Sequence, residues 1–439
     1  MDTLFSHVSV LTMDSRMSVW PDAFVGVTDG KISWLAKKAP DEQPGQIIDG
    51  SGMVLLPGLT NCHTNLPLTI LRGYGAEKPY AEWLRDYVYP CAERMDTRAA
   101  KASALLGMAE CLRFGVTSIS DLSAFPAAVA EAAAQCGMKA SVAPEMTMLL
   151  GDEFDFETYP ECKSLAALCD TWNGFENGRI RVDAGIQGEY TSSEELWLPL
   201  AEYAMTNGLG MQLHLSETAQ EQADCEERSG LTPAQLLDCY HLFDVRAAAA
   251  GCAHLTQEDA RLLAKRHVSA VCCPVHDLAL GLETADAAAL VKAGMNVCLG
   301  TGAAAAGGNL DLLGVMRELA LSSRARGSAI PAQAALMMAT LCGARAQGRE
   351  AECGQIRVGL DADLVLVNFN QPHLIPCHDI PADLVYAASG RDVALTMVRG
   401  KILYADGKFP TIDLNAVARE LHDYVIPKVF SDSPEAKNA

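Results

Sequence analysis

The sequence predicts an α/β protein, with a (β/α)₈ TIM-like barrel and a small β-sandwich built from both chain termini. Two observations support this fold class. Apolar strands alternate with helical segments through the middle of the chain, and short strands broken by turns fill both ends. Eight βα units over about 290 residues are typical of a barrel. The predicted divisions are residues 1–56 with 350–412 for the β-sandwich, 57–349 for the barrel, and 413–439 for a C-terminal helix and tail.

The sandwich prediction rests on matching patterns at the two ends of the chain. Near the N-terminus, apolar residues 24–27 and 32–35 flank Asp29-Gly30, a dipeptide that favours a tight hairpin turn. Near the C-terminus, residues 363–367 form an apolar strand, and residues 395–402 lead to another Asp-Gly pair. Two strand-rich ends around a long middle indicate one sheet domain assembled from both.

The barrel prediction rests on eight apolar strands, the first of them in the run that begins at Val54. Helices are expected between them, with capping spacings at Ser192 and Thr232 and a further helix after Thr256. A doubly wound open sheet is the alternative, but no Gly-x-Gly-x-x-Gly follows the first strand. The later strands are predicted at residues 115–121, 139–144, 180–185, 210–214, 247–253, 268–273 and 295–300.

Composition excludes some classes of function. The formal net charge of −21 over 439 residues, without basic clusters, argues against nucleic acid or an anionic membrane surface as a partner. We expect no signal peptide and no membrane span. The fifteen cysteines lack a disulfide-framework spacing and no Cys-x-x-Cys occurs, so reduced, buried thiols in a cytoplasmic protein are expected.

Several motifs resemble one known family. The chain is similar to the aminohydrolase branch of the amidohydrolase superfamily, close to the adenosine, methylthioadenosine and S-adenosylhomocysteine deaminases and the triazine hydrolases. The likeness covers nearly the whole chain and implies the barrel and sandwich described above. It is carried by Pro57 to His63, Leu71-Arg72-Gly73, Glu82-Trp83-Leu84, His214 to Thr218, Asn309-Leu310-Asp311, Gly354 to Asp363 and Leu384 to Gly407.

The resemblance implies one divalent metal, zinc or iron, held by four histidines and an aspartate at the ends of barrel strands. His63 and His214 match two of these ligands. The other three positions carry Asn65, Gly251 and Gly302, and glycine has no side-chain ligand atom. The family's substrate-contacting histidine after the fourth strand is replaced by Gln187, which is predicted, with Asn65, to contact substrate.

These replacements predict weak or absent metal binding. A bound ion lowers the pKa of its water from 15.7 to about 7, which is on the order of 10 kcal/mol of hydroxide formation. Catalytic zinc usually has three protein ligands, and only two imidazoles remain here. Restoring Asn65→His, Gly251→His and Gly302→Asp together is expected to create metal binding.

Other residues could carry chemistry without the family's ion. Glu217 matches the carboxylate that shuttles a proton, and His214 is a free acid or base. His276 and Asp277 replace a family Ser-Asn after the seventh strand; they could hold a relocated metal with His63, His214 and Cys62 or Cys252, bind a polar ligand, or lie in a surface loop. The strand alternation places both cysteines in the strand–helix layer. Arg72 could bind an anionic group or form a salt bridge.

Three functions remain open from the sequence. The first is hydrolysis of non-peptide C–N bonds in small cyclic, purine- or triazine-like ligands through an altered site. The second is a metal-free isomerase or lyase that uses Glu217, His214 and His276 for proton transfer. The third is a non-catalytic ligand-binding homologue. A small-molecule ligand is expected in each case, and a homodimer through a C-terminal helix at residues 415–424 is predicted from the family.

Overall fold

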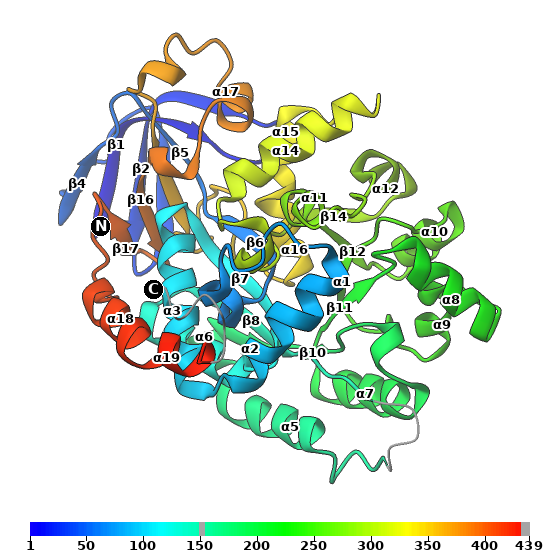
Figure 1. Ribbon diagram of the computed structural model, residues 1–439. Coiled ribbons are helices and arrows are strands. Elements are labelled where there is room, and N and C mark those ends of the chain that lie inside the picture. The colour runs from blue at the N-terminus through cyan, green and yellow to red at the C-terminus, as the bar shows by residue number, and fades with distance from the viewer. Residues whose placement is uncertain (149–153, 432–439) are drawn as a thin grey trace.

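The computed structural model describes residues 1–148 and 154–431, and it contains a closed barrel beside a terminal sheet domain (Figure 1). The predicted tail at 432–439 lies outside the described residues. In chain order the barrel strands are β6 (Leu59–Thr64), β7 (Val116–Ser123), β8 (Lys139–Pro144), β9 (Ile180–Val182) with β10 (Ala184–Gly185), β11 (Met211–Leu215), β12 (Ala247–Gly251), β13 (Ser269–Cys272) and β14 (Asn296–Leu299).

All neighbouring barrel strands are parallel, and the barrel closes between its first and last strands. Thr64 on β6 forms a parallel bridge with Gly302, and the Gly302 N–H donates to the His63 carbonyl at 3.1 Å. The fourth strand is split at Asp183, whose N–H donates to Val142 on one side while the next N–H donates to Gly210 on the other. Parallel strands around a closed barrel bring all their carboxyl ends to one face.

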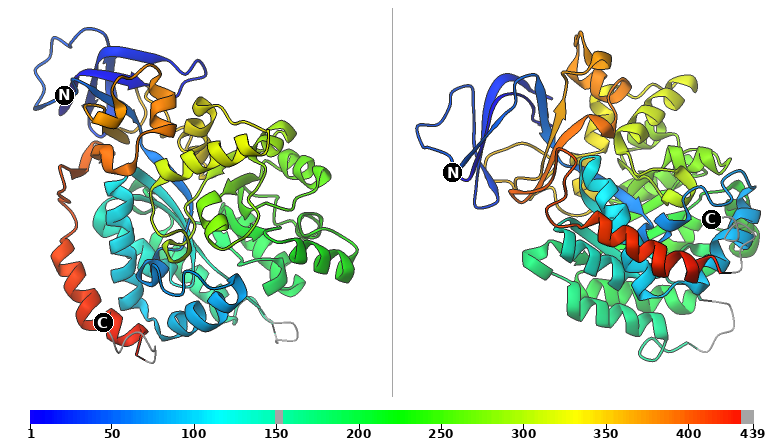
Figure 2. Two further views of the ribbon diagram at one scale, coloured as in Figure 1. Left: turned by 45° about the horizontal axis from the view of Figure 1, so that its top comes forward. Right: turned by 60° about the vertical axis from the view of Figure 1, so that its left-hand side comes forward.

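Helices surround the barrel, as the alternation of strands and helices predicts (Figure 2). The main ones are α3 (Thr97–Arg113), α4 (Pro126–Cys136), α5 (Pro160–Trp172), α7 (Glu194–Asn207), α8 (Ala219–Ser229), α9 (Pro233–Cys239), α10 (Gln257–Lys265), α12 (Ala287–Ala293) and α14 (Leu312–Ala325). Thr232 and Thr256 each form a capping box, whereas α7 begins at Ser193 without a side-chain cap. Ser192 instead donates to the Gly188 carbonyl at 2.8 Å and accepts from Trp197, so the predicted cap there is wrong.

The sheet domain combines strands from both ends of the chain. Its eight strands run in the order β17-β16-β15-β5-β1-β2-β3, with β4 paired to β1. Asp29 and Gly30, both with positive φ, form the predicted hairpin turn between β2 and β3. The strands are β1 (Thr3–Leu11), β2 (Val19–Thr28), β3 (Lys31–Ala36), β4 (Gln46–Asp49), β5 (Met53–Pro57), β15 (Leu364–Asn368), β16 (Val393–Val398) and β17 (Lys401–Ala405).

The apolar run from Val54 does not form the first barrel strand. It is β5, which pairs with β1 and β15 in the terminal sheet, and the barrel begins after a single intervening residue, at Leu59. Gly58 lies between the two strands. A larger residue does not fit there, because a Cβ would lie 2.0 Å from Thr117 Oγ1 on β7. The alternation along β5 turns Leu55 into the sheet core and Val54 and Leu56 toward the barrel helices.

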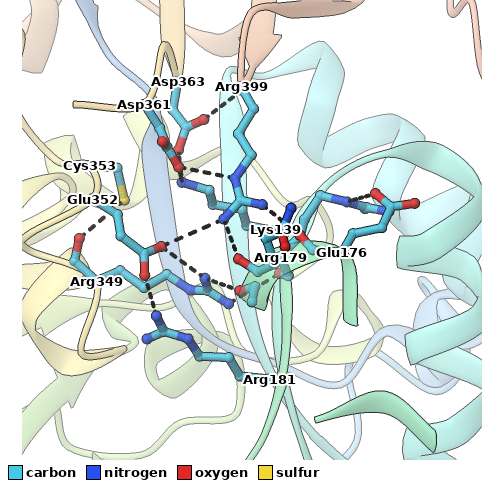
Figure 3. Close-up of polar contacts among 12 residues, drawn as sticks. Lys139, Glu176, Arg179, Arg181, Arg349, Glu352, Cys353, Asp361, Asp363 and Arg399 are labelled. Atoms are coloured by element: carbon cyan, nitrogen blue, oxygen red, sulfur yellow. Dashed lines mark hydrogen bonds and ion pairs between the residues drawn. The ribbon is translucent and has the colours of Figure 1, made fainter. Parts of the chain in front are cut away.

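A buried charge network joins the sheet domain to the bottom of the barrel (Figure 3). Lys139 on β8 is fully buried and lies 2.9 Å from Asp361 and 2.6 Å from Asp363. Arg399, at the turn between β16 and β17, donates to Asp361 at 3.0 Å. Buried charges are costly unless paired, and the pairs formed by Lys139 cross the boundary between the two domains.

The C-terminal helical segment packs against its own chain. It comprises α18 (Leu414–Glu420), a π-helical turn (Leu421–Val425) and α19 (Ile426–Val429), and it lies along α3 (Figure 1). Arg98 of α3 pairs with Glu420, and the Tyr424 hydroxyl donates to Asp96 at 2.5 Å. Across the described residues, no helix combines the length and apolar character that a membrane crossing requires.

Candidate active site

The site residues predicted from the sequence converge at the carboxyl ends of the barrel strands. His63 is the penultimate residue of β6, and His214 stands at the same level on β11. Their Nε2 atoms are 3.2 Å apart and their rings are almost perpendicular, at 87°. The two imidazoles are therefore in direct contact at the centre of the barrel mouth.

Hydrogen bonds fix the roles of the two histidines. His214 Nδ1 donates to the carbonyl oxygen of Gln187 at 2.7 Å, after the fourth strand. Burial lowers the pKa of His214, but the charges of Glu217 and Glu145 and the Gln187 carbonyl raise it more, so the net shift is upward. Burial and the neighbouring His214 hold the pKa of His63 well below its usual value. The pair thus favours a proton on His214 that is donated from Nε2 to a neutral His63.

The space beside Gly251 and Gly302, the two glycines at predicted ligand positions, is occupied. Gly251, at the end of β12 with φ of +90°, has Glu217 against it: a Cβ there would lie 2.5 Å from Glu217 Cγ. Gly302, with φ of +62°, has His276 against it: a Cβ would lie 2.5 Å from His276 Cδ2 and 2.9 Å from its Cβ. Side chains from other positions therefore occupy the volume beside both glycines.

His276 and Asp277 lie on α11 (Pro274–Ala279), directly after β13. His276 Nδ1 is 3.2 Å from Asp277 Oδ1, and Asp277 is buried. Burial raises the pKa of Asp277, and its contact with His276 offsets part of that rise. The structure places this pair beside the barrel seam rather than in a surface loop.

Two further carboxylates, Glu145 and Glu221, lie close to the two histidines, and sequence reasoning missed both. Glu145 follows β8, and burial raises its pKa to about 7. Asn65 Nδ2 lies 3.5 Å from Glu145 Oε2, so the asparagine at a lost ligand position faces this acid. The signal that could have found Glu145 is its place directly after a barrel strand. Glu221 accepts the N–H groups of Ser216 and Glu217, and burial raises its pKa to about 7.

Three tyrosines that sequence reasoning also missed surround these acids. Burial, together with the charge of Glu217, raises the pKa values of Tyr80 and Tyr190. The pKa of Tyr89 is raised by its burial and by Glu145. The Gln187 side-chain amide donates to the Tyr190 hydroxyl at 3.2 Å, so Gln187 links the fourth strand to this aromatic group. These tyrosines lie in short helical segments that carry no local pattern marking them as site residues.

Arg72 forms the salt bridge that the sequence left open as an alternative, and the packing predicted for Cys62 is wrong. Arg72 does not reach the strand ends; it pairs with Glu110 on α3 and lines a surface groove with Tyr404 and Phe409. Cys252 packs into the strand–helix layer as predicted, but Cys62 packs into a small separate cluster inside the barrel. The register shift between β6 and β7 disturbs the simple alternation on which that prediction relied. The other buried members of the Cys62 cluster are Ala248, Ala250, Val271, Cys273, Cys298 and Ala346.

The donors at these positions do not fit the family's metal ion. Of the five ligand positions, only His63 and His214 carry imidazoles, and the glycine positions are filled by Glu217 and His276. Within residues 1–148 and 154–431, no three His, Cys, Asp or Glu side chains are grouped so that they could hold an ion. A relocated site built from His276, Asp277 and the cysteines is not formed there.

The fold and the positions of these residues define a class, that of (β/α)₈-barrel proteins with functional groups at the strand ends and a sheet domain from both termini. Residues 54–403 match the amidohydrolase family. The chain belongs to this family. All fifteen cysteines of this member are free thiols.

Several similar proteins carry the names of deaminases of adenosine-derived compounds. A 5-methylthioadenosine/S-adenosylhomocysteine deaminase from Moorella thermoacetica is 35% identical over 378 residues, 85% of this chain and 87% of the relative. A 5'-deoxyadenosine deaminase from Methanosarcina mazei is 33% identical over 422 residues, 95% of this chain and 96% of the relative.

Solved structures agree on the fold. An adenosine deaminase from Xanthomonas campestris with bound zinc superposes with a TM-score of 0.90 at 28% identity, over 97% of this chain and 98% of that one. An atrazine chlorohydrolase from Arthrobacter aurescens complexed with zinc has a TM-score of 0.89 at 23% identity, over 96% of this chain and all of that one, and shows the fold alone. A divalent metal is thus a feature of the family.

Proposed function

We propose that this protein is a divergent member of the hydrolytic deaminases that binds a small purine-like ring compound at its barrel mouth. In this proposal, the family's metal-dependent hydrolysis of non-peptide C–N bonds is weak or absent. The ring ligand is supported by the relatives' adenosine-derived compounds. The observation that carries the loss of metal is that Glu217 and His276 fill the space beside Gly251 and Gly302.

The size of the metal's contribution makes its loss decisive. When bound, such an ion activates water for attack, a contribution on the order of 10 kcal/mol to hydroxide formation. His63, His214 and Glu217 can orient a water and move its proton, which typically contributes a factor of roughly 10² to 10⁴. Acid–base chemistry therefore replaces only part of what the ion provides.

The test combines metal analysis with turnover and binding. We expect protein purified in the presence of zinc to hold less than about 0.2 equivalents of Zn, Fe or Mn, since a catalytic site needs three protein ligands. Adenosine, 5'-deoxyadenosine and 5'-methylthioadenosine should bind in calorimetry, while their deamination, followed by mass spectrometry, is slow or undetectable. A full equivalent of metal together with rapid deamination would contradict the proposal.

A second candidate, a metal-free isomerase or lyase, is favoured by one specific observation. Glu145 and Glu221 are carboxyl groups with pKa values of about 7 beside a histidine pair. Groups poised near neutral pH suit general acid–base catalysis. In this candidate, Glu217, His214 and His276 transfer protons, and Gln187, Asn65 and Asp277 orient the ligand.

Substitution at Glu217 separates the second candidate from a ligand-binding protein without activity. If metabolite pools yield a turned-over compound, Glu217→Gln should lower its turnover by about 10²-fold or more. Glu258→Gln, on the exposed side of α10, is the matched control and should leave turnover unchanged. Retained binding with no turnover in the unaltered protein would instead identify a non-catalytic homologue.

Homodimerisation also stays a proposal, and the C-terminal helix limits how it could occur. Val417, Val425 and Val429 are buried within the chain, next to α3 and α2 (Tyr89–Arg94). A dimer through this segment must therefore use its outer face, where Leu414 and Ile426 are exposed. Analytical ultracentrifugation of the full chain, compared with a Leu414→Asp/Ile426→Asp variant, tests this contact.

A further inference from the structure

Position 302 lies at the barrel seam beside the first site histidine. The Gly302 N–H donates to the His63 carbonyl, and the residue bridges Thr64 of β6. A side chain at this position would begin next to His63, where the family places its aspartate ligand. The volume that such a side chain needs is taken by His276.

The obstruction by His276 involves its Cβ and Cγ atoms as well as its ring. Its Cβ, Cγ and Cδ2 would lie 2.9, 2.6 and 2.5 Å from a Cβ at position 302, all closer than real Cβ contacts. Since Cβ moves only with the backbone, rotation of the ring alone cannot clear the space. The backbone of α11 is held by its place after β13 and by a cap at Leu280, whose N–H donates to the carbonyls of His276 and Asp277.

The obstruction at Gly251 comes from a flexible side chain. There the nearest atom is Glu217 Cγ at 2.5 Å, part of a side chain with free rotation about its bonds, while the backbone atoms lie at 3.3 Å or more. A new side chain at 251 can displace the glutamate without moving a helix. The two lost ligand positions therefore differ in how readily they could be refilled.

We propose that His276 and any side chain at position 302 exclude each other, so that His276 must be shortened before a ligand at the strand-8 position can hold a metal ion. This inference goes beyond the proposed function, because it concerns which residue bars the ion rather than what the site turns over. It replaces the expectation from the sequence that three restored ligands suffice. The change to the family's serine, His276→Ser, removes the two nearest atoms, Cδ2 and Cγ, and leaves only the Cβ contact of 2.9 Å.

The first experiment is a stability cycle that needs neither metal nor substrate. Gly302→Ala should lower the thermal midpoint by about twice as much as Gly281→Ala or more, because both glycines have positive φ but position 281 faces open space. In the His276→Ser background, which lacks Cγ and Cδ2 but keeps the Cβ at 2.9 Å, the loss caused by Gly302→Ala should fall most of the way to that of the control. An equal loss in both backgrounds would overturn the proposal.

The second experiment measures metal binding directly with Co²⁺ and Zn²⁺ as the only probes. The variant Asn65→His/Gly251→His/Gly302→Asp should hold less than about 0.2 equivalents, and the same variant with His276→Ser should hold roughly one, with the visible bands of protein-bound Co²⁺. Equal binding by both variants, or none by either, would overturn the proposal. Metal in the unaltered protein would contradict the proposed function. The stability cycle would still test whether His276 and a side chain at position 302 exclude each other.

Discussion

Glu145 shows how a single half-buried acid can couple the site to pH. Its folded-state pKa of about 7 lies above the usual value of 4.5 because of burial. The neutral carboxyl is therefore favoured in the folded protein, and the stability it supports is lost as pH rises from about 4.5 through 7.

The variant Glu145→Gln tests this residue. The amide that it introduces keeps an oxygen that can accept from Asn65 but does not ionise, so the variant should gain stability relative to the unaltered protein as pH rises. We expect the difference in unfolding free energy to grow by about 2–3 kcal/mol between roughly pH 5 and pH 8. Urea unfolding at the two pH values measures it, with Glu258→Gln as control. A difference that stays constant would show that the acid is ionised in the folded protein.

Sequence reasoning at the residue scale succeeded where the signal is local. His63, Asn65, His214, Gly251 and Gly302 all lie in short motifs at the ends of strands, so their convergence followed from the barrel alone. The filling of the space beside Gly302 depends instead on where α11 places His276 in three dimensions. No spacing in the sequence encodes that path.

At the scale of single elements, helix caps provide a measurable prediction. Thr232 and Gln235 form a reciprocal capping box on α9, whereas Ser193 begins α7 without a side-chain bond to its helix backbone. Thr232→Ala should cost about 1 kcal/mol of unfolding free energy, with Ser193→Ala costing less. Denaturant unfolding of both variants checks this order. Equal losses would mean that the Thr232 bonds are replaced by water at no cost.

The wrong assignment of the first barrel strand has a physical cause at the same scale. The strands β5 and β6 follow each other with only Gly58 between them, and both are buried, but only β5 is an apolar run because β6 carries mainly polar residues. An apolar run reads alike in a terminal sheet and in a parallel barrel. Gly58 lies at the boundary between the terminal sheet and the barrel. Its close approach to Thr117 is visible only in three dimensions.

At the scale of the whole molecule, the charge network at the base of the barrel predicts sensitivity to acid. Burial alone would raise the pKa of Asp361, but Lys139, Lys31 and Arg399 lower it to about 2, below its usual 3.8. A depressed carboxyl pKa stabilises the fold above pH 3.8, and this stabilisation is lost as pH falls from 3.8 toward 2.

The variant Asp361→Asn tests that network. It should destabilise the protein by about 2–4 kcal/mol at neutral pH, because buried Lys139 loses one of its two partners. The difference from the unaltered protein should shrink by about 1 kcal/mol between roughly pH 5 and pH 3. Asp41→Asn, at an exposed surface pair, should change little. A pH-independent difference would mean that Asp361 contributes packing and hydrogen bonds but no charge.

The junction at Gly58 has a consequence for how the molecule opens. One residue joins β5, in the middle of the terminal sheet, to β6, which carries His63 five positions further on. Because only Gly58 lies between β5 and β6, local unfolding of the terminal sheet at β5 should also disturb β6, the strand that carries His63. Amide protons of β5 and β6 should then exchange with solvent at matching rates, as one cooperative unit that spans both lobes.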